Sequence, residues 1–277
     1  MKPKDQIIVA LDVPDADQAW AIARELAPHV GWFKIGLELI TSGSAHRLTR
    51  DILMAGGKVF YDGKFCDIPN TVKAASKGAV RSGAGMFNVH ALSGLEAMRA
   101  AAEGAREAHE LVSSMEDPPI VLGVTLLTSL GSEQLVQLKV FTRKLNGELR
   151  FGVQLRMEAG SFKTPTLTDA DIEEMVVTLA LAAKESGLHG VVASPKETAA
   201  IRTACGPDFL IVTPGVRPAG VAINDQKRVL TPREAIEAGA NYLVIGRPIL
   251  MPESGTRVEA AQRIAEEITL AWQGVRA

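Results

Sequence analysis

Short apolar runs rich in β-branched residues alternate with amphipathic, alanine-rich segments along most of this 277-residue chain. The runs have the length of buried strands, and the segments between them have the helical spacing of apolar positions. The predicted strands are Ile7–Val13, Trp32–Leu39, Lys58–Lys64, Met86–Leu92, Ile120–Thr128, Gly190–Pro195, Leu210–Val216 and Tyr242–Pro248. The predicted helices include Ala16–Ala27, Ala45–Ala55, Val72–Arg81, Gly94–His109, Asp171–Ser186, Thr231–Ala238 and Val258–Trp272.

Strands that alternate with helices are typical of a parallel sheet whose strands are joined by crossovers. Eight such repeats in about 250 residues predict an α/β fold of the (β/α)8 TIM-barrel type, formed by one domain over residues 1–277. A doubly wound open sheet is the alternative, but it often has a glycine-rich first turn, and this turn reads Leu11-Asp12-Val13-Pro14. Helix N-caps are expected at Asp15, Ser93, Thr168 and Thr231, and helix-ending glycines at Gly56, Gly187 and Gly239.

One segment interrupts the repeat. About forty residues separate the fifth strand from the helix that begins near Asp171, whereas loops in compact domains usually have a handful. Within residues 139–163, apolar and polar residues alternate around Asn146-Gly147, a dipeptide that favours a two-residue hairpin turn. We therefore expect an insertion over approximately residues 139–163 that contains a small β-hairpin.

Composition and charge narrow the classes of function. The net charge of −2 lacks the basic excess typical of proteins that bind nucleic acids or anionic membranes. The apolar run Ile7–Leu11 is too short for a signal peptide, and no run reaches the roughly 18 apolar residues of a membrane span. Cys66 and Cys205 have no metal-ligand spacing, which favours reduced thiols in a cytoplasmic protein.

Charged residues gather where the predicted strands end, which is where barrel enzymes place their functional groups. Asp12 lies at the end of the first strand, Lys34 lies in the second, and Asp62 and Lys64 end the third. Because strand side chains alternate, Asp62 and Lys64 are expected on one face and Gly63 on the other. Buried charges are costly unless they pair or meet a ligand, so the pair either binds a ligand or only fixes the strand register.

The ten residues from Asp62 to Thr71 read Asp-Gly-Lys-Phe-Cys-Asp-Ile-Pro-Asn-Thr. This segment resembles the signature of orotidine 5'-monophosphate decarboxylases, in which Asp-x-Lys-x-x-Asp precedes Ile-Pro-Asn-Thr. Gly63 departs from the bulkier residue common in the family, and we expect a small packing cost and no loss of activity. Further matches follow in order: Val9–Asp12, Phe33–Gly36, Asn88–His90, Val124–Ser129, Thr213–Pro218, Asp225–Gln226 and Val244–Pro248. Only residues 139–163 are expected to fall outside the resemblance.

The resemblance implies that the chain converts orotidine 5'-phosphate to UMP and CO2 in pyrimidine biosynthesis, without a metal or an organic cofactor. It implies that Lys64 stabilises the carbanion at C6 and donates the proton that replaces CO2, a role suited to a fixed cation. Asp62, Asp67 and Lys34 would complete a catalytic array that keeps Lys64 charged. The resemblance also implies a homodimer with shared active sites, in which Asp67 and Thr71 reach the partner's site.

Other positions are expected to bind the substrate. By resemblance, Asp12 and Lys34 hold the ribose hydroxyls, and Thr128 or Ser129 contacts the pyrimidine. Barrel enzymes often bind phosphate in the loops after strands seven and eight, where arginine offers a forked donor and glycine a close backbone approach. The candidates for phosphate binding are Arg217, Gln226, Gly246 and Arg247.

Two other functions fit part of the pattern. A magnesium-dependent sugar-phosphate decarboxylase or lyase of the same superfamily shares the Asp-x-Lys-x-x-Asp core, and Glu38 lies four residues after Lys34 on the expected same face. A non-catalytic phosphate-binding module would need only the phosphate loops. The Ile-Pro-Asn-Thr tail and the complete set of charges favour the decarboxylase. His90, a lone histidine at a strand end, is interpreted as structural.

Overall fold

The computed structural model describes residues 2–112, 117–137, 142–145, 148–151, 167–218 and 230–275. Its barrel strands are β1 (Ile7–Ala10), β2 (Trp32–Ile35), β3 (Lys58–Phe65), β4 (Met86–His90), β5 (Ile120–Val124), β8 (Gly190–Val192), β9 (Leu210–Pro214) and β10 (Tyr242–Ile245). Its α-helices are α1 (Ala16–Leu26), α2 (Leu37–Thr41), α3 (Ala45–Met54), α4 (Pro69–Arg81), α5 (Leu95–His109), α6 (Ser132–Gln137), α7 (Asp169–Glu185), α8 (Thr198–Cys205), α9 (Pro232–Glu237), α10 (Arg247–Leu250) and α11 (Arg257–Val275).

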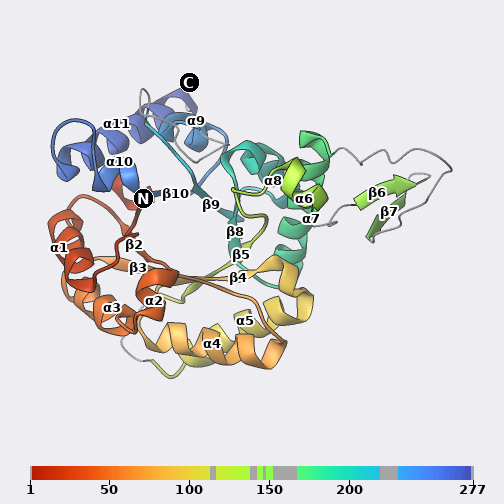
Figure 1. Cartoon of the computed structure of the whole chain (residues 1–277), viewed down its shortest axis with the longest axis horizontal. Coiled ribbons are helices and arrows are strands. Elements are labelled where there is room, and N and C mark those ends of the chain that lie inside the picture. The colour runs from red at the N-terminus through yellow and green to blue at the C-terminus, as the bar shows by residue number, and fades with distance from the viewer. Residues whose placement is uncertain are drawn as a thin grey trace.

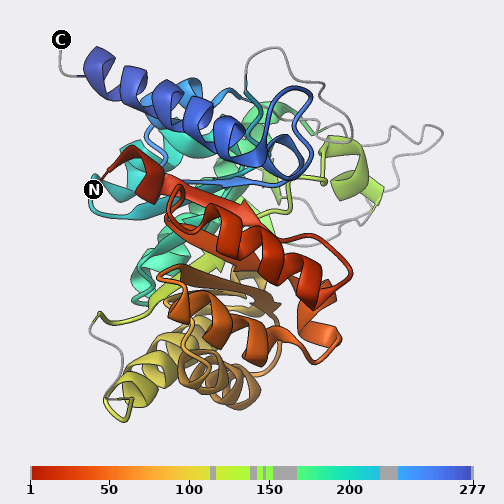
Figure 2. The same cartoon turned by 90° about the vertical axis from the view of Figure 1, so that its left-hand side faces the viewer.

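The eight strands close into a barrel in the order β1-β10-β9-β8-β5-β4-β3-β2, and every neighbouring pair is parallel. Figure 1 shows the helices arranged around this barrel, and Figure 2 shows β1 running toward the side of the molecule that carries α2. The predicted TIM barrel is therefore confirmed, and the open doubly wound sheet is excluded.

The barrel interior is filled by apolar side chains, called here the apolar layer. They come from seven of the eight barrel strands and comprise Ile8, Ala10, Trp32, Phe60, Met86, Leu122, Val212 and Val244. Trp32 packs edge-on against Tyr242, with ring centroids 6.1 Å apart, and the Lys58 ammonium lies 5.4 Å from the Trp32 ring centroid. Trp32 and Met86 are the first residues of their strands, so this layer fills the barrel toward the amino ends of the strands.

The outward faces of the strands pack against the helices in two clusters. One joins β1, β2 and β10 to α1, α3, α9 and α11, and the other joins β4, β5 and β8 to α4, α5, α7 and α8. Alanines dominate the buried faces of α1 and α5, which lets these helices approach the strands closely. The helices therefore fix the strand ends on which functional side chains stand.

All eight predicted strands begin at the residue where the observed strands begin. Seven of them were predicted to run too far, whereas β3 continues one residue beyond its predicted end at Lys64. After β2, Gly36 starts the short helix α2, so that Leu37 to Leu39 are helical and not extended. The end of the last predicted strand likewise forms α10. The short helices α6 and α8 were not predicted, because six or eight residues give too few turns for a clear apolar period.

The helix caps follow the sequence at most predicted positions. The side chains of Asp15, Thr168 and Thr231 accept hydrogen bonds from backbone N–H groups in the first turns of their helices. Ser93 is a correction: Gly94 occupies the N-cap of α5, and the Ser93 hydroxyl donates instead to the His90 carbonyl at 2.6 Å. The three expected helix-ending glycines all have positive φ, between 78° and 106°.

In the expected insertion, β6 (Thr142–Leu145) and β7 (Glu148–Phe151) pair antiparallel and form a sheet separate from the barrel. Figure 1 shows this pair to one side of the barrel. The other residues of 139–163 lie outside the described ranges. Among the described helices, none has both the length and the hydropathy needed to cross a membrane.

We expect Gly190→Ala to lower the free energy of unfolding by about 3 kcal/mol, because close-packed strands do not accept an added methyl group without strain. A Cβ at Gly190 would overlap the Leu210 carbonyl on neighbouring β9. Urea unfolding measures this change. Gly78→Ala is the matched control: Gly78 lies exposed in α4 with open space around it, so alanine should leave stability equal or higher. Equal stability of both variants would contradict the packing described for β8 and β9.

Candidate active site

The charged residues lie next to the apolar layer, two residues farther toward the carboxyl ends of their strands. Lys34 lies two residues after Trp32, and Asp62 lies two residues after Phe60, so that each faces the same side as its apolar predecessor. Lys34 and Asp62 are both buried, with Asp62 only 6% exposed. The barrel therefore supplies an apolar floor with charges directly above it, at the carboxyl ends of the strands.

The Asp62 carboxylate is the centre of this group. Its Oδ1 accepts hydrogen bonds from Lys64 Nζ and Asn88 Nδ2, each at 2.7 Å. Its Oδ2 lies 3.3 Å from Lys34 Nζ, and Lys34 Nζ also donates to Asp12 Oδ1 at 2.9 Å. The structure thus brings together Asp12, Lys34, Asp62 and Lys64 in an array of alternating charge.

Burial and charge act in opposite directions on the two most buried members. Burial alone would lower the pKa of Lys34, but attraction to Asp62 and Asp12 outweighs it and raises that pKa. Burial alone would raise the pKa of Asp62, but the charges of Lys34 and Lys64 and their hydrogen bonds lower it. Both groups are therefore held in their charged forms at neutral pH.

Lys64 reaches this array through an irregular strand. The pairing of β3 with β4 runs from Tyr61↔Phe87 to Phe65↔Val89, so β3 advances four residues while β4 advances two. Lys64 lies within this bulge and is the one non-glycine residue of positive φ, 46°, in the described ranges. The prediction that Asp62 and Lys64 lie together is confirmed, but simple strand alternation does not explain it.

Gly63 is explained by the same bulge. A Cβ at this position would lie 2.7 Å from the Phe65 ring, which packs against the rings of Tyr61 and Phe87 with centroids 6.2 Å and 5.9 Å away. The space of a larger side chain is therefore occupied by an aromatic cluster. Gly63 does not line the cavity beside Lys64.

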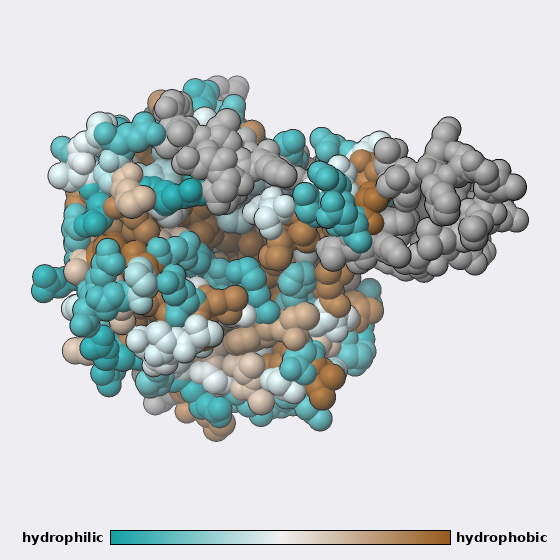
Figure 3. Space-filling view, in the orientation of Figure 1, coloured by the Kyte–Doolittle hydropathy of each residue, from teal (hydrophilic) through white to brown (hydrophobic). Residues whose placement is uncertain are grey.

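A cavity of about 210 Å³ opens beside the charged array. Figure 3 shows that the face at the carboxyl ends of the strands is hollowed near its middle, where hydrophobic and hydrophilic residues meet. The lining combines the charges of Lys34, Asp62 and Lys64 with Thr128, Ser129 and the apolar residues Phe60, Val124, Leu126, Leu127, Val192, Ala193, Pro214 and Val244. The apolar residues were not predicted as site residues, although Phe60 and Val244 could have been found from strand alternation. The cavity offers a flat apolar group a place directly against Lys64.

Asp67 and Thr71 stand apart from this array. Both are exposed, and Thr71 lies in the first turn of α4. Asp67 Oδ1 accepts a hydrogen bond from the Ile68 N–H at 2.6 Å, and in the described part of the chain Asp67 forms no ion pair. Within one chain, the structure does not join these two residues to Lys64.

Three of the four candidate phosphate residues follow two adjacent strands, β9 and β10. Gly246 follows β10, and a Cβ there would lie 3.9 Å from Asp12 Oδ2, so the backbone of this loop approaches the charged array. Arg247 begins α10 and is exposed. Arg217 follows β9, is buried, and donates to the Val216 carbonyl at 3.0 Å. Neither arginine lines the 210 Å³ cavity, and Gln226 lies outside the described residues.

Glu38 lies away from the charged array. It was expected to share a face with Lys34, and this is wrong, because Glu38 is exposed in α2 beyond the end of β2. No group of three or more histidine, cysteine, aspartate or glutamate side chains in the described ranges could hold a metal ion.

His90, at the end of β4, was interpreted as structural. Its Nδ1 accepts a hydrogen bond from the Leu92 N–H at 3.3 Å, and burial together with the charge of Lys64 lowers the pKa of His90.

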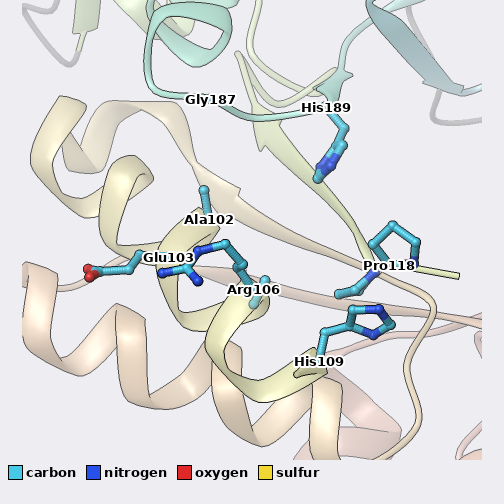
Figure 4. Close-up of a pocket in the computed structure, with 9 residues that line it drawn as sticks. Ala102, Glu103, Arg106, His109, Pro118, Gly187 and His189 are labelled. Atoms are coloured by element: carbon cyan, nitrogen blue, oxygen red, sulfur yellow. The ribbon is translucent and has the colours of Figure 1, made fainter. Parts of the chain in front are cut away.

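A second cavity, of about 350 Å³, lies at the opposite end of the barrel (Figure 4). Pro119 and His189 directly precede β5 and β8, which places them at the amino ends of the strands. His189 Nδ1 accepts a hydrogen bond from the Val121 N–H at 3.0 Å. The charged residues of this cavity, Glu103 and Arg106, are exposed, so it lacks the buried ion pairs of the carboxyl end.

The fold and this array define a barrel enzyme with a buried lysine–aspartate centre at the carboxyl ends of its strands. The model of the orotidine 5'-phosphate decarboxylase / HUMPS family matches residues 5–149 and 156–264, and the chain belongs to this family. The expectation for residues 139–163 was too broad, because the match is broken only at residues 150–155.

Individual relatives agree with this assignment. Orotidine 5'-phosphate decarboxylase of Moorella thermoacetica is 45% identical over 98% of this chain and 94% of its own length. That of Syntrophomonas wolfei is 44% identical over 97% of this chain and 99% of its own length. Among solved structures, orotidine 5'-phosphate decarboxylase of Lactobacillus acidophilus has a TM-score of 0.73 and 30% identity, with 95% of this chain and 98% of that chain covered.

We expect the free energy of unfolding to depend on pH through the ionisation of Asp62. The lowered pKa means that Asp62 stabilises the fold above its unfolded pKa of about 3.9, and that this stabilisation is lost as the pH falls through the folded pKa. Asp62→Asn should lower the free energy of unfolding at about pH 6 by about 3 kcal/mol, because buried Lys34 loses a partner. Urea unfolding from about pH 6 to about pH 3 should show this difference shrinking. A difference independent of pH would mean that Asp62 is not held ionised.

Proposed function

We propose that this chain decarboxylates orotidine 5'-phosphate to UMP and CO2, the last step in making the first pyrimidine nucleotide. One observation carries the proposal: Lys64 Nζ lies 2.7 Å from buried Asp62 and lines a largely apolar cavity of about 210 Å³. A fixed ammonium in such a cavity suits a reaction that develops negative charge on a ring carbon. The names of the relatives agree with this reaction.

The chemistry requires that the bond between C6 and the carboxylate carbon breaks. The electron pair of this bond stays on C6, in an orbital that the ring π system cannot delocalise, and CO2 leaves. We assign Lys64 to stabilise this carbanion by its charge and then to transfer an Nζ proton to C6, which gives UMP. The neutral amine regains its proton from solvent before the next turnover.

Asp62 and Lys34 prepare Lys64 for this role. The Asp62 carboxylate accepts a hydrogen bond from Lys64 Nζ at 2.7 Å and thereby holds the ammonium in place beside the cavity. Lys34 balances the second oxygen of Asp62 and the carboxylate of Asp12. The array therefore needs no rearrangement when charge develops on C6, which is the advantage of a preorganised site.

The remainder of the substrate is assigned to neighbouring groups. We place the pyrimidine in the cavity against Thr128 or Ser129, and the ribose hydroxyls at Asp12 and Lys34. The phosphate is assigned to Arg217, Gln226, Gly246 and Arg247. The position of Gly246 supports a phosphate site next to the ribose site, because the Gly246 backbone lies near Asp12.

We further propose that the active species is a homodimer in which each site takes Asp67 and Thr71 from the partner chain. Both residues are exposed, and Asp67 has no ion-pair partner in the described part of its own chain. Ile68 between them is 67% exposed and is therefore accessible to a second chain. In a dimer with a two-fold axis, the same segment of both chains would lie at the interface.

We further propose that the protein is cytoplasmic, because Cys66 and Cys205 are free thiols.

The reaction itself can be followed by the loss of orotidine 5'-phosphate absorbance in the ultraviolet. We expect turnover that is unchanged by EDTA, because Lys64 supplies both the charge and the proton. Lys64→Ala should lower kcat at least about a thousandfold. Lys77→Ala is the matched control, since Lys77 lies in α4 and pairs with Glu107. Activity that EDTA abolishes and Mg2+ restores would favour the sugar-phosphate lyase alternative.

Arg247→Ala should lower kcat/KM at least about a hundredfold while the fold stays intact, because remote binding energy is used to stabilise the transition state. Steady-state kinetics and circular dichroism measure the two effects. Arg233→Ala is the control, since exposed Arg233 pairs with Glu237 at 2.7 Å in α9. A loss of less than about tenfold for Arg247→Ala would mean that other groups hold the phosphate.

Mixing two inactive variants tests the shared site. Lys64→Ala and Asp67→Ala should each be nearly inactive as homodimers. A mixed dimer combines both defects in one site and leaves intact Lys64 and intact Asp67 in the other, so activity should return after subunit exchange. Mass spectrometry of the intact dimers gives the heterodimer fraction. If heterodimers form and the mixture stays inactive, Asp67 serves its own chain.

A further inference from the structure

We infer that Asn88 is a positioning residue that holds both the backbone of Lys64 and the carboxylate of Asp62. Asn88 lies in β4 and is fully buried, with 0% of its surface exposed. Both polar atoms of its side chain bond to residues of the proposed catalytic array. The inference rests on the proposed decarboxylation and adds a residue to which no role has been assigned.

The first contact replaces a bond that the sheet cannot make. In the bulge of β3, the backbone leaves the parallel register between Tyr61 and Phe65, and Asn88 stands opposite on β4. The Lys64 N–H donates to Asn88 Oδ1 at 2.7 Å. A buried N–H without a partner would cost about 1–3 kcal/mol, so this amide oxygen stabilises the bulge.

The backbone of Lys64 makes this support necessary. A φ of 46° is unfavourable for a residue with a Cβ and persists only where the surroundings enforce it. In a regular strand φ is negative, and the Cα–Cβ bond of Lys64 would then point in a different direction. The hydrogen bond to Asn88 therefore helps to direct Lys64 Nζ toward the cavity.

The second contact sets the Asp62 carboxylate. Asn88 Nδ2 donates to Asp62 Oδ1 at 2.7 Å, the same oxygen that accepts the hydrogen bond from Lys64 Nζ. This bond lowers the pKa of Asp62, in addition to the larger effects of Lys34 and Lys64. A neutral amide does so without adding charge, so the array keeps its balance of two lysines against Asp12 and Asp62.

Asn88 does not line the cavity beside Lys64, so it acts through Lys64 and Asp62 rather than on the substrate. Substrate binding should therefore depend little on this residue, because the pyrimidine, ribose and phosphate have contacts elsewhere. Its loss should affect the chemical step, in which the position of Lys64 Nζ relative to C6 decides the rate. A residue that only supports packing would not separate these two effects.

The experiment compares Asn88→Ala with wild type in the ultraviolet assay. We expect kcat to fall about 30-fold, the size of one lost charge-assisted hydrogen bond, while KM changes less than about threefold. Asn241→Ala is the matched control. Asn241 precedes β10 at the amino end, where its Oδ1 accepts hydrogen bonds from Arg202 and from the Ile211 N–H. The control should lose stability and keep kcat.

A second variant, Asn88→Asp, keeps the shape and the acceptor for the Lys64 N–H. Its introduced carboxyl can donate to Asp62 only when protonated, and the neighbouring charge of Asp62 raises the pKa of that carboxyl. Lys34, Lys64 and His90 are the other titratable groups nearby. The ratio of variant to wild-type kcat should therefore rise about tenfold between about pH 8 and about pH 5.

The outcomes separate this inference from the proposed function. If wild type does not decarboxylate orotidine 5'-phosphate, the proposed function fails. If wild type is active and folded Asn88→Ala keeps kcat within about threefold, the positioning role is wrong. Should Asn88→Ala not fold, Asn88→Asp decides: a kcat ratio that does not change with pH overturns the inference.

Discussion

A single buried carboxylate holds the site together. Asp62 is 6% exposed, and an ionised carboxylate at such a depth is costly unless several donors surround it. Lys34, Lys64 and Asn88 provide these donors from three neighbouring strands, at 3.3, 2.7 and 2.7 Å. Removing Asp62 would leave two lysines close together at the barrel mouth without the carboxylate that pairs with both of them.

The barrel makes this arrangement possible in two ways. Strand alternation carries the inward face from the apolar layer of Trp32 and Phe60 to the charges of Lys34 and Asp62 two residues later. The bulge in β3 then departs from alternation and brings Lys64 back beside Asp62. Regular structure thus provides the apolar floor, and one local irregularity positions Lys64, the proposed reactive group.

The sequence predicted the barrel well because its signals are local. All eight strands begin within one residue of the start of an apolar run, and three of the four expected N-caps have the expected side-chain bonds. Strand ends were less predictable, since Gly36 and Gly246 begin short helices inside apolar runs and thereby displace Glu38. Asn88 was recognised only as part of a motif, because its role depends on a bulge in another strand. A site shared through Asp67 stays a prediction, because it depends on a second chain and not on local sequence signals.

In the proposed reaction, Lys64 is held by Asp62 and Asn88 and faces the reacting carbon. A crystal structure of the protein with bound UMP tests this arrangement most directly. We expect the pyrimidine in the cavity lined by Phe60 and Val192, with Lys64 Nζ about 3 Å from C6 and still bonded to Asp62. A pyrimidine bound outside this cavity, or a Lys64 side chain directed away from C6, would contradict it.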